Sequence, residues 1–296
     1  MKTHTITRQV IKAFLVMFLL PTMVLAQEKG NLLSKKEIRK ARPSYISLSF
    51  GMNSGNFRDF ATSPLIYNGF VTTSGASKLR IDDVRESDYG FLFSAGTFSN
   101  SFNDHTSAST VKTLSLHYTQ LYKLKALNSE KYSVKVGGMV NVTGNLRTNI
   151  SLQNNAVGVE IIPTIFGSVK VTKNISRKEE KSKRFLFIKY KAKPRTRHIS
   201  FNLNVGLMNS SYRNGYVYSG KSSVLNNLSL FDDYSFDMFS GFRIKTALDY
   251  TVTLANKNKI QLSYMWDAYK TGGDFDKLEF ASHIFKLSFL FNTNNK

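Results

Sequence analysis

The sequence predicts an all-β fold, namely a closed antiparallel transmembrane β-barrel of about ten strands, with eight strands as the alternative. Apolar and polar residues alternate along most of the chain, and the polar face is rich in Ser, Thr, Asn and Gly. No stretch of about 18 apolar residues follows the N-terminus, so a helical membrane protein is excluded. Residues 198–209 illustrate the pattern, since Ile199 and Phe201 fall on one side of an extended chain and Ser200 and Asn202 on the other.

The first 26 residues are typical of a cleaved secretory signal peptide. Lys2, Arg8 and Lys12 supply a charged region, residues 13–20 an apolar core, and residues 24–26 a small-residue cleavage site. The apolar core has about half the length of a spanning helix, which favours cleavage over a retained anchor. The expected organisation is therefore a signal peptide at 1–26, a basic periplasmic tail at 27–43, an outer-membrane barrel at 44–292 and a C-terminal tail at 293–296.

Charge and cysteine content narrow the function classes. The signal removes three of the 41 basic residues, which leaves 38 against 20 acidic residues and a net charge of +18. An exported chain with this charge is expected to meet anionic envelope lipids or glycans, and no nucleic-acid motif is present. The absence of cysteine excludes disulfides, thiolate metal sites and a cysteine nucleophile.

The first five expected strands have an apolar residue at every second position. The weakest of them is the second, because its TTSGAS stretch has little apolar pattern. These five strands are expected at residues 44–53, 67–80, 88–99, 111–124 and 131–144.

The other five strands follow the same alternation. In the sixth strand Pro163 cannot donate a backbone hydrogen bond, so it is expected at a bulge or a strand margin. These strands are expected at residues 159–172, 198–209, 235–254, 259–269 and 283–292.

The connections are of two kinds. Short polar turns such as 126–130 and 255–259 contrast with long stretches rich in Asn, Ser and Gly, at 54–66, 145–158 and 209–234. If the two kinds alternate, each gathers at one end of the barrel. Ten strands then place both termini at the short-turn end, which is expected in the periplasm.

Strand length and aromatic placement indicate that the apolar face contacts lipid. Eleven residues rising about 3.3 Å each, tilted by roughly 40°, span about 28 Å, close to the apolar band of about 25 Å in such barrels. Closure follows because unpaired N–H and C=O groups are costly in hydrocarbon. The alternative is a secreted soluble β-barrel. Aromatic residues expected at the membrane interfaces are Tyr45, Tyr89, Tyr118, Tyr122, Tyr132, Tyr250, Tyr264 and Trp266.

On these features the chain resembles the small outer-membrane β-barrel proteins of Gram-negative bacteria. The last expected strand, HIFKLSFLFN at 283–292, is similar to the terminal signal that the barrel-assembly machinery reads in that family. The resemblance covers most of the mature chain and is architectural. It implies an outer-membrane location, with outer-membrane lipids and the assembly machinery as partners.

Eight ionisable residues are expected to point into the barrel. They form either an active site or, as we favour, an ion-pair network that fills a narrow lumen. No nucleophile is spaced to act with His117, and neither His105 nor His283 has metal-ligand spacing. We therefore expect no enzyme activity, no cofactor and no metal. The eight are His117, Lys135, Glu160, Arg243, Lys245, Asp249, Asp267 and Lys286.

A basic segment, residues 173–198, holds eleven Lys or Arg residues against Glu179 and Glu180. It could dock on anionic inner-leaflet lipids, with the apolar tetrad at 185–188 dipping into the membrane. The favoured alternative is a solvated periplasmic hairpin. The residues proposed for lipid contact are Arg177, Lys178, Lys181, Lys183, Arg184, Lys189, Lys191 and Lys193.

The expected function is a structural or surface-binding role in the outer membrane. Asn-, Ser- and Tyr-rich outer loops would form the contact surface, since binding residues concentrate on loops held by rigid scaffolds. A narrow, anion-leaning channel for small solutes is the second hypothesis, because the inward charges are mostly cationic. A soluble binding protein and a lipid- or peptide-modifying enzyme are less favoured.

Overall fold

The computed structural model describes residues 42–129, 131–152, 156–176, 179–185, 187–192, 194–214, 234–273 and 276–294. The expected signal peptide and all but two residues of the basic tail lie outside the described residues. The domain boundaries expected there stay predictions.

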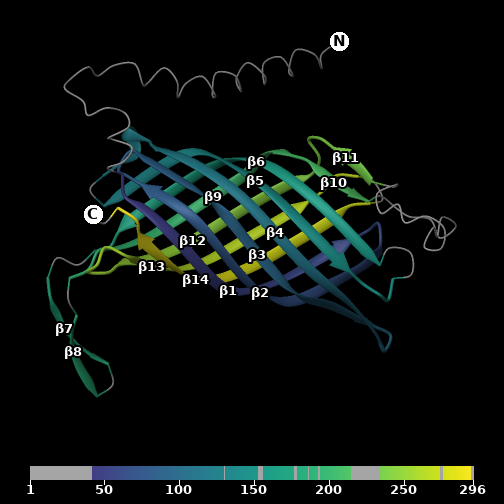
Figure 1. Cartoon of the computed structure of the whole chain (residues 1–296), viewed down its shortest axis with the longest axis horizontal. Helices are drawn as coiled ribbons and strands as arrows, with labels where there is room; N and C mark the ends of the chain where they lie inside the picture. Colours follow the sequence, from purple (N-terminus) through teal and green to yellow (C-terminus); the bar gives the residue numbers. More distant parts are fainter. Residues whose placement is uncertain are drawn as a thin grey trace, which may run out of the picture. The chain divides into compact units, whose positions relative to one another are not determined.

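Ten antiparallel strands close into a barrel (Figure 1). Each strand pairs with its neighbours in the chain order of the ten, β1 pairs with β14, and every strand therefore has a partner on both sides. The strands are β1 (Ser44–Asp59), β2 (Ser63–Ile81), β3 (Arg85–Phe102), β4 (His105–Lys123), β5 (Tyr132–Thr148), β6 (Val157–Asn174), β9 (Arg197–Asn209), β12 (Phe242–Thr253), β13 (Lys259–Lys270) and β14 (Leu278–Asn292).

We call the end of the barrel where β1 begins and β14 finishes the terminal end, and the opposite end the distal end. At the terminal end, the β6–β9 connection contains a separate hairpin of β7 (Lys181–Phe185) and β8 (Ile188–Ala192), and the β4–β5 connection contains the turn η1 (Lys125–Leu127). At the distal end, β10 (Ser211–Asn214) pairs with β6 and with β11 (Tyr234–Asp237).

The ten expected strands are confirmed, with corrections at their ends. Residues 54–66, expected as a long loop, mostly extend β1 and β2, and residues 145–148 and 157–158 extend β5 and β6. The Asp59 side chain makes this short turn, because it accepts hydrogen bonds from the Ala61 N–H and the Thr62 hydroxyl. The eighth strand starts at Phe242, not at 235.

Along one of its edges β6 pairs with β10 at Ile161 and with β9 from Thr164 onward, and Pro163 lies between these two pairings. β9 ends at Asn209 and β10 begins at Ser211, and the Ser210 N–H donates to the Pro163 carbonyl oxygen over 3.0 Å. The register between β6 and β9 shifts at Ile165. The unpaired residue at this shift is Leu207 of β9, so Pro163 lies beside the bulge and not at it, within β6 and opposite Val142 of β5.

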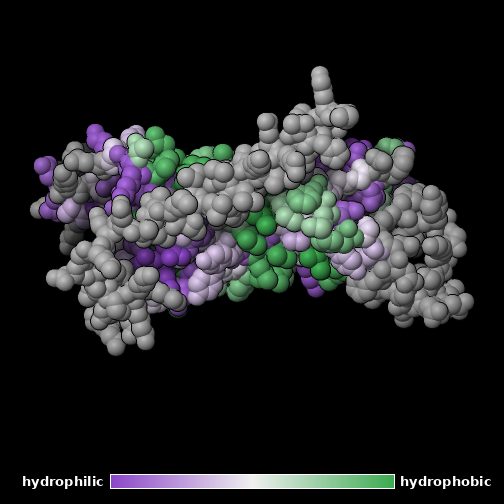
Figure 2. All heavy atoms as spheres, turned by 90° about the horizontal axis from the view of Figure 1, so that it is seen from above, coloured by the Kyte–Doolittle hydropathy of each residue, from purple (hydrophilic) through white to green (hydrophobic). Residues whose placement is uncertain are grey.

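The outer surface of the barrel is apolar and its interior is polar. Along β1, Leu48 and Phe50 are 42% and 63% exposed, whereas Ser47 and Ser49 point inward and are buried. Figure 2 shows hydrophobic residues gathered over the middle of the barrel and hydrophilic residues nearer its ends. Such a continuous apolar belt is stable only in lipid. The protein is therefore an outer-membrane β-barrel, and the soluble alternative is wrong.

The expected aromatic residues at the interfaces mostly face outward. Tyr89, Tyr118, Tyr122 and Tyr132 are between 39% and 49% exposed. Tyr45 is an exception, because its side chain is buried inside the barrel with the Lys259 Nζ 4.4 Å from the ring centroid. No helix among the described residues is long and apolar enough to cross a membrane.

Candidate functional site in the barrel interior

The barrel interior contains four groups of side chains between the distal and terminal ends. We name them the distal ion cluster, the aromatic layer, the chamber and the terminal ion cluster. Inward positions occur at every second residue of a strand, so each strand contributes to several of these levels.

The distal ion cluster consists of Asp59 on β1, Arg147 on β5, Glu160 on β6 and Arg213 on β10. All four side chains are buried. Asp59 accepts hydrogen bonds from Arg147 and from the Arg213 Nη2, the latter over 2.5 Å. Arg147 also donates to the Glu160 Oε1 from Nη2 over 2.5 Å and from Nε over 2.8 Å. Each buried charge therefore has an opposite partner, which burial away from water requires.

The aromatic layer lies next to the distal ion cluster, with the Arg147 guanidinium 5.2 Å from the Phe57 ring centroid. The Phe57 and Tyr67 rings are stacked with centroids 5.0 Å apart, and Tyr269 and Phe280 are stacked at 5.3 Å. Its members come from seven strands around the wall and none is more than 8% exposed: Phe57, Tyr67, Val71, Phe98, Val111, Ile162, Tyr269, Leu278 and Phe280. The layer therefore joins seven of the ten barrel strands, while β5, β9 and β12 contribute none of its members.

A buried ion pair underlies the aromatic layer on the terminal side. Arg243 donates from Nε to the Asp267 Oδ1 over 3.1 Å and from Nη2 to Oδ2 over 2.8 Å. Its guanidinium lies 4.9 Å from the Tyr269 ring centroid and also donates to the Thr143 hydroxyl over 3.0 Å. The Lys245 Nζ lies 3.6 Å from the Asp267 Oδ2.

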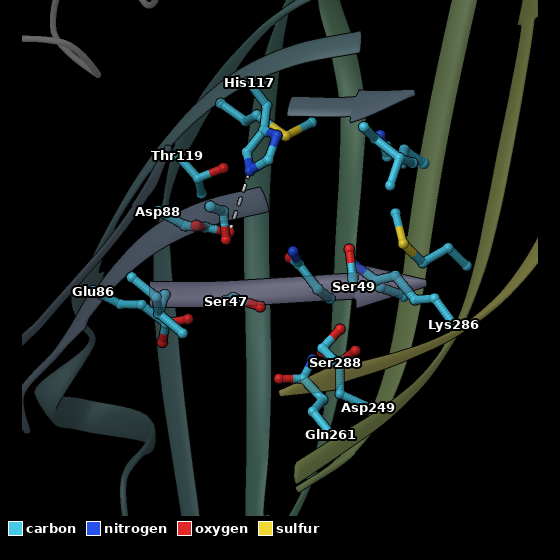
Figure 3. Close-up of a pocket in the computed structure, with 18 of the residues that line it drawn as sticks. Ser47, Ser49, Glu86, Asp88, His117, Thr119, Asp249, Gln261, Lys286 and Ser288 are labelled. Carbon is cyan, nitrogen blue, oxygen red and sulfur yellow. Dashed lines mark hydrogen bonds and ion pairs between the residues drawn. The ribbon is translucent and has the colours of Figure 1, made fainter. Parts of the chain in front are cut away.

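The chamber is a cavity of about 150 Å³ in the terminal half of the barrel. His117 and Asp88 lie on its wall, with the His117 Nε2 3.3 Å from the Asp88 Oδ2 (Figure 3). Its other polar lining residues come from nine strands: Ser47, Ser49, Ser77, Glu86, Ser115, Thr119, Lys170, Asn202, Asn204, Lys245, Asp249, Gln261, Lys286 and Ser288. The chamber is thus a mixed-charge pocket rich in hydroxyl groups.

The terminal ion cluster is centred on Glu86, which is buried near the start of β3. Glu86 accepts hydrogen bonds from Lys170 and, over 3.4 Å, from the Lys135 Nζ. Lys135 also donates to the Asp82 carbonyl oxygen over 2.9 Å, which attaches the β2–β3 turn to β5. These contacts narrow the barrel at its terminal end.

All eight lumen residues expected from the sequence point into the barrel, but they do not form one site. Glu160 belongs to the distal ion cluster, Arg243 and Asp267 underlie the aromatic layer, and Lys135 belongs to the terminal ion cluster. The remaining four line the chamber, namely His117, Lys245, Asp249 and Lys286.

Sequence reasoning did not identify six further inward charges. Arg213 lies on the short strand β10, which no pattern indicated. Asp88 and Lys170 already lie within expected strands, at inward positions. Asp59, Glu86 and Arg147 lie just beyond expected strand ends, so extending those strands by a few residues would have found them. The six are Asp59, Glu86, Asp88, Arg147, Lys170 and Arg213.

The basic segment forms the β7–β8 hairpin. Arg177, Lys178 and Lys193 lie outside the described residues, and for the other proposed lipid-contact residues the structure describes only the backbone pairing. The lipid-docking hypothesis therefore stays a prediction.

The interior offers little for catalysis in the described part of the chain. The His117 side chain has Asp88 as its only hydrogen-bond partner there, so no hydroxyl nucleophile is paired with it. No group of three or more potential metal ligands occurs among the described residues.

No family model and no curated protein sequence matches the chain. Among solved structures, the chain is similar to the outer membrane protease OmpT from Escherichia coli, with a TM-score of 0.53, 7% identity, and coverage of 84% of this chain and 96% of that one. The translocator domain of the autotransporter NalP from Neisseria meningitidis gives a TM-score of 0.35 and 6% identity, covering 86% and 92% of the two chains. An outer membrane channel from Pseudomonas putida F1 gives 0.29 and 9%, covering 84% and 96%.

The fold therefore resembles that of Gram-negative outer-membrane barrels, as the last strand and the alternation indicated. At 7% identity the likeness to OmpT concerns the fold alone.

Proposed function

We propose that the protein is a closed outer-membrane barrel with a structural or surface-binding role at its distal end, and that it neither conducts solutes nor catalyses a reaction. The aromatic layer is the observation that carries this proposal. The side chains that line a water-filled pore are accessible to water. The side chains of Phe98 and Phe57 are only 1% and 2% exposed. Barrels of this size leave an interior that side chains can fill.

The binding part of the proposal rests on apolar side chains exposed at the distal end. Phe236 lies on β11, where it pairs with Tyr212 of β10, and Met238 and Phe239 join β11 to β12. These three side chains are 55%, 56% and 73% exposed, and Ile150 in the β5–β6 connection is 94% exposed. Exposed apolar groups in polar loops are typical of protein–protein contact surfaces. We place the distal end at the cell surface, with the termini in the periplasm.

Conductance in planar bilayers tests the closed lumen. Correctly folded wild-type protein is expected to give no channel events, and the double variant Phe57→Ala/Phe98→Ala is expected to give small, frequent ones because it removes two rings of the aromatic layer. Phe50→Ala, on the lipid face, serves as the control and is expected to remain silent. Gel mobility before and after heating verifies folding of each variant.

Steady wild-type conductance would overturn the proposal in favour of the small-solute channel, for which the chamber is the supporting observation. Turnover of envelope lipids or peptides by the wild type that disappears in His117→Ala would replace it with an enzyme function.

A further inference from the structure

Two lysines face the chamber from strands that are separated by a single strand. Lys245 lies on β12 and Lys286 on β14, with β13 between them, and both line the same cavity. Both side chains belong to the lining of this one cavity, and Lys245 is buried. Like charges held together in an enclosed space repel each other strongly unless an anion lies near both.

The carboxylates nearby do not balance these lysines. Among the described residues, Lys286 has no carboxylate within ion-pair distance, and Lys245 has only Asp267, at 3.6 Å. Asp267 in turn accepts two hydrogen bonds from Arg243, so two cations share its carboxylate. Asp88 interacts with Lys286 at longer range but is hydrogen-bonded to His117.

The next carboxylate on the same strand does not correct the imbalance. Asp249 lies two inward positions from Lys245 on β12, in the register row that contains Ser263 and Lys286. It is not within ion-pair distance of either lysine among the described residues, and the Ser200 hydroxyl donates to it over 3.4 Å. The distal part of the chamber therefore keeps an excess of positive charge.

We propose that the chamber binds a small oxyanion, held between the ammonium groups of Lys245 and Lys286. A hydroxyl donor is available on the chamber wall from Ser288 (Figure 3), whereas the Ser49 hydroxyl donates to the Gly75 carbonyl oxygen over 3.2 Å. Lysine ammonium groups suit phosphate, sulfate and carboxylate, since each offers oxygen atoms to several donors. A cavity of about 150 Å³ is large enough for benzene and so admits an anion of four to six heavy atoms, by an order-of-magnitude comparison.

The anion reaches this site from the terminal end. The aromatic layer closes the distal side, whereas the chamber wall extends to Leu79, Glu86 and Leu290, close to the terminal ends of β2, β3 and β14. The site is thus independent of the surface role proposed above.

Calorimetric titration of the folded barrel in detergent micelles with inorganic phosphate tests this site. We expect saturable binding to the wild type and an affinity lower by about tenfold or more in Lys245→Gln and in Lys286→Gln, since each removes a charge-assisted hydrogen bond. Lys112→Gln is the matched control, because Lys112 is exposed on the outer face of β4. Sulfate and acetate titrations distinguish an inorganic oxyanion from a carboxylate ligand.

Heat-modifiable gel mobility verifies that each variant is folded. Binding that both chamber variants lose and the control keeps would support the site. The absence of phosphate, sulfate and acetate binding to folded wild type would overturn it, as would equal affinities in all three variants.

Discussion

Asp59 is the shared ion-pair partner of two of the other three side chains in the distal ion cluster. Arg147 and Arg213 both donate to its carboxylate, and its side chain also caps the β1–β2 turn. A neutral residue here would leave two buried guanidinium groups short of a partner. Removing one member of a buried ionic network generally costs more than the network contributes over an apolar replacement.

We therefore predict that Asp59→Asn destabilises the barrel by about 3–5 kcal/mol, the usual cost of breaking a buried pair. The measurement is the urea midpoint of unfolding in micelles. Asp104→Asn is the control, because Asp104 is exposed in the β3–β4 turn at φ 63°, a conformation that Asn accepts. Equal midpoints for the two variants would show that the ion cluster contributes nothing.

The inward orientation of single residues could be predicted, but their partners could not. Alternation placed Arg243 and Asp267 in the lumen, yet they belong to different strands and meet only because β12 and β13 pair in one register. Asp59 escaped prediction since Ser54 and Asn56 break the apolar face of β1 beyond Met52. The polar residues that face outward beyond Met52 mark where β1 leaves the lipid, and β1 itself continues to Asp59.

The strands as elements are longer than a membrane crossing requires. β2 and β4 each have 19 residues, whereas about 9–11 residues cross at the usual tilt. The surplus lies at the distal end, where the outer face turns polar and the interior holds the aromatic layer. On β1, for example, Asn56 faces outward beside the inward Phe57.

A lysine scan along the outer face of β1 tests this division. Phe50→Lys is predicted to cost about 2–4 kcal/mol because it places a charge in hydrocarbon, and Asn56→Lys about 0–1 kcal/mol because it meets water. The two positions share a strand and a face, so each controls the other. Unfolding midpoints in lipid vesicles measure both, and equal costs would contradict the belt boundary.

The second strand shows what alternation could not predict at the element scale. Its stretch at 72–77 has little apolar pattern, yet β2 pairs with β1 and β3 over nearly its whole length. Two well-patterned neighbours supply the hydrogen bonds and the adjacent apolar groups, so tertiary pairing overrides weak local preference.

Closure of the sheet into a barrel is a property of the whole molecule. The β6–β9 pairing joins the first six strands to the last four across the β7–β8 hairpin, and it removes the two free edges that an open sheet would expose to lipid. With ten strands, the start of β1 and the end of β14 both lie at the terminal end of the barrel. The orientation of this end in the membrane is the part of the topology to test.

Because the chain contains no cysteine, a single introduced cysteine reports directly which side of the membrane its position faces. We predict that Ile150→Cys, at the distal end, reacts with a membrane-impermeant maleimide on intact cells. Phe187→Cys, 88% exposed in the β7–β8 turn, should react only after the outer membrane is permeabilised. The reverse pattern would invert the proposed orientation.

By itself, the sequence determined the fold class and which side of each strand faces lipid, because a repeat of two residues is a local property of an extended chain; it left ten or eight strands, and the strand pairing decided for ten. Only the tertiary structure showed that apolar side chains from seven strands gather in one buried layer, and which charges meet. Those contacts depend on the register and circumference of the closed barrel, which bring Asp59 beside Arg213, far along the chain.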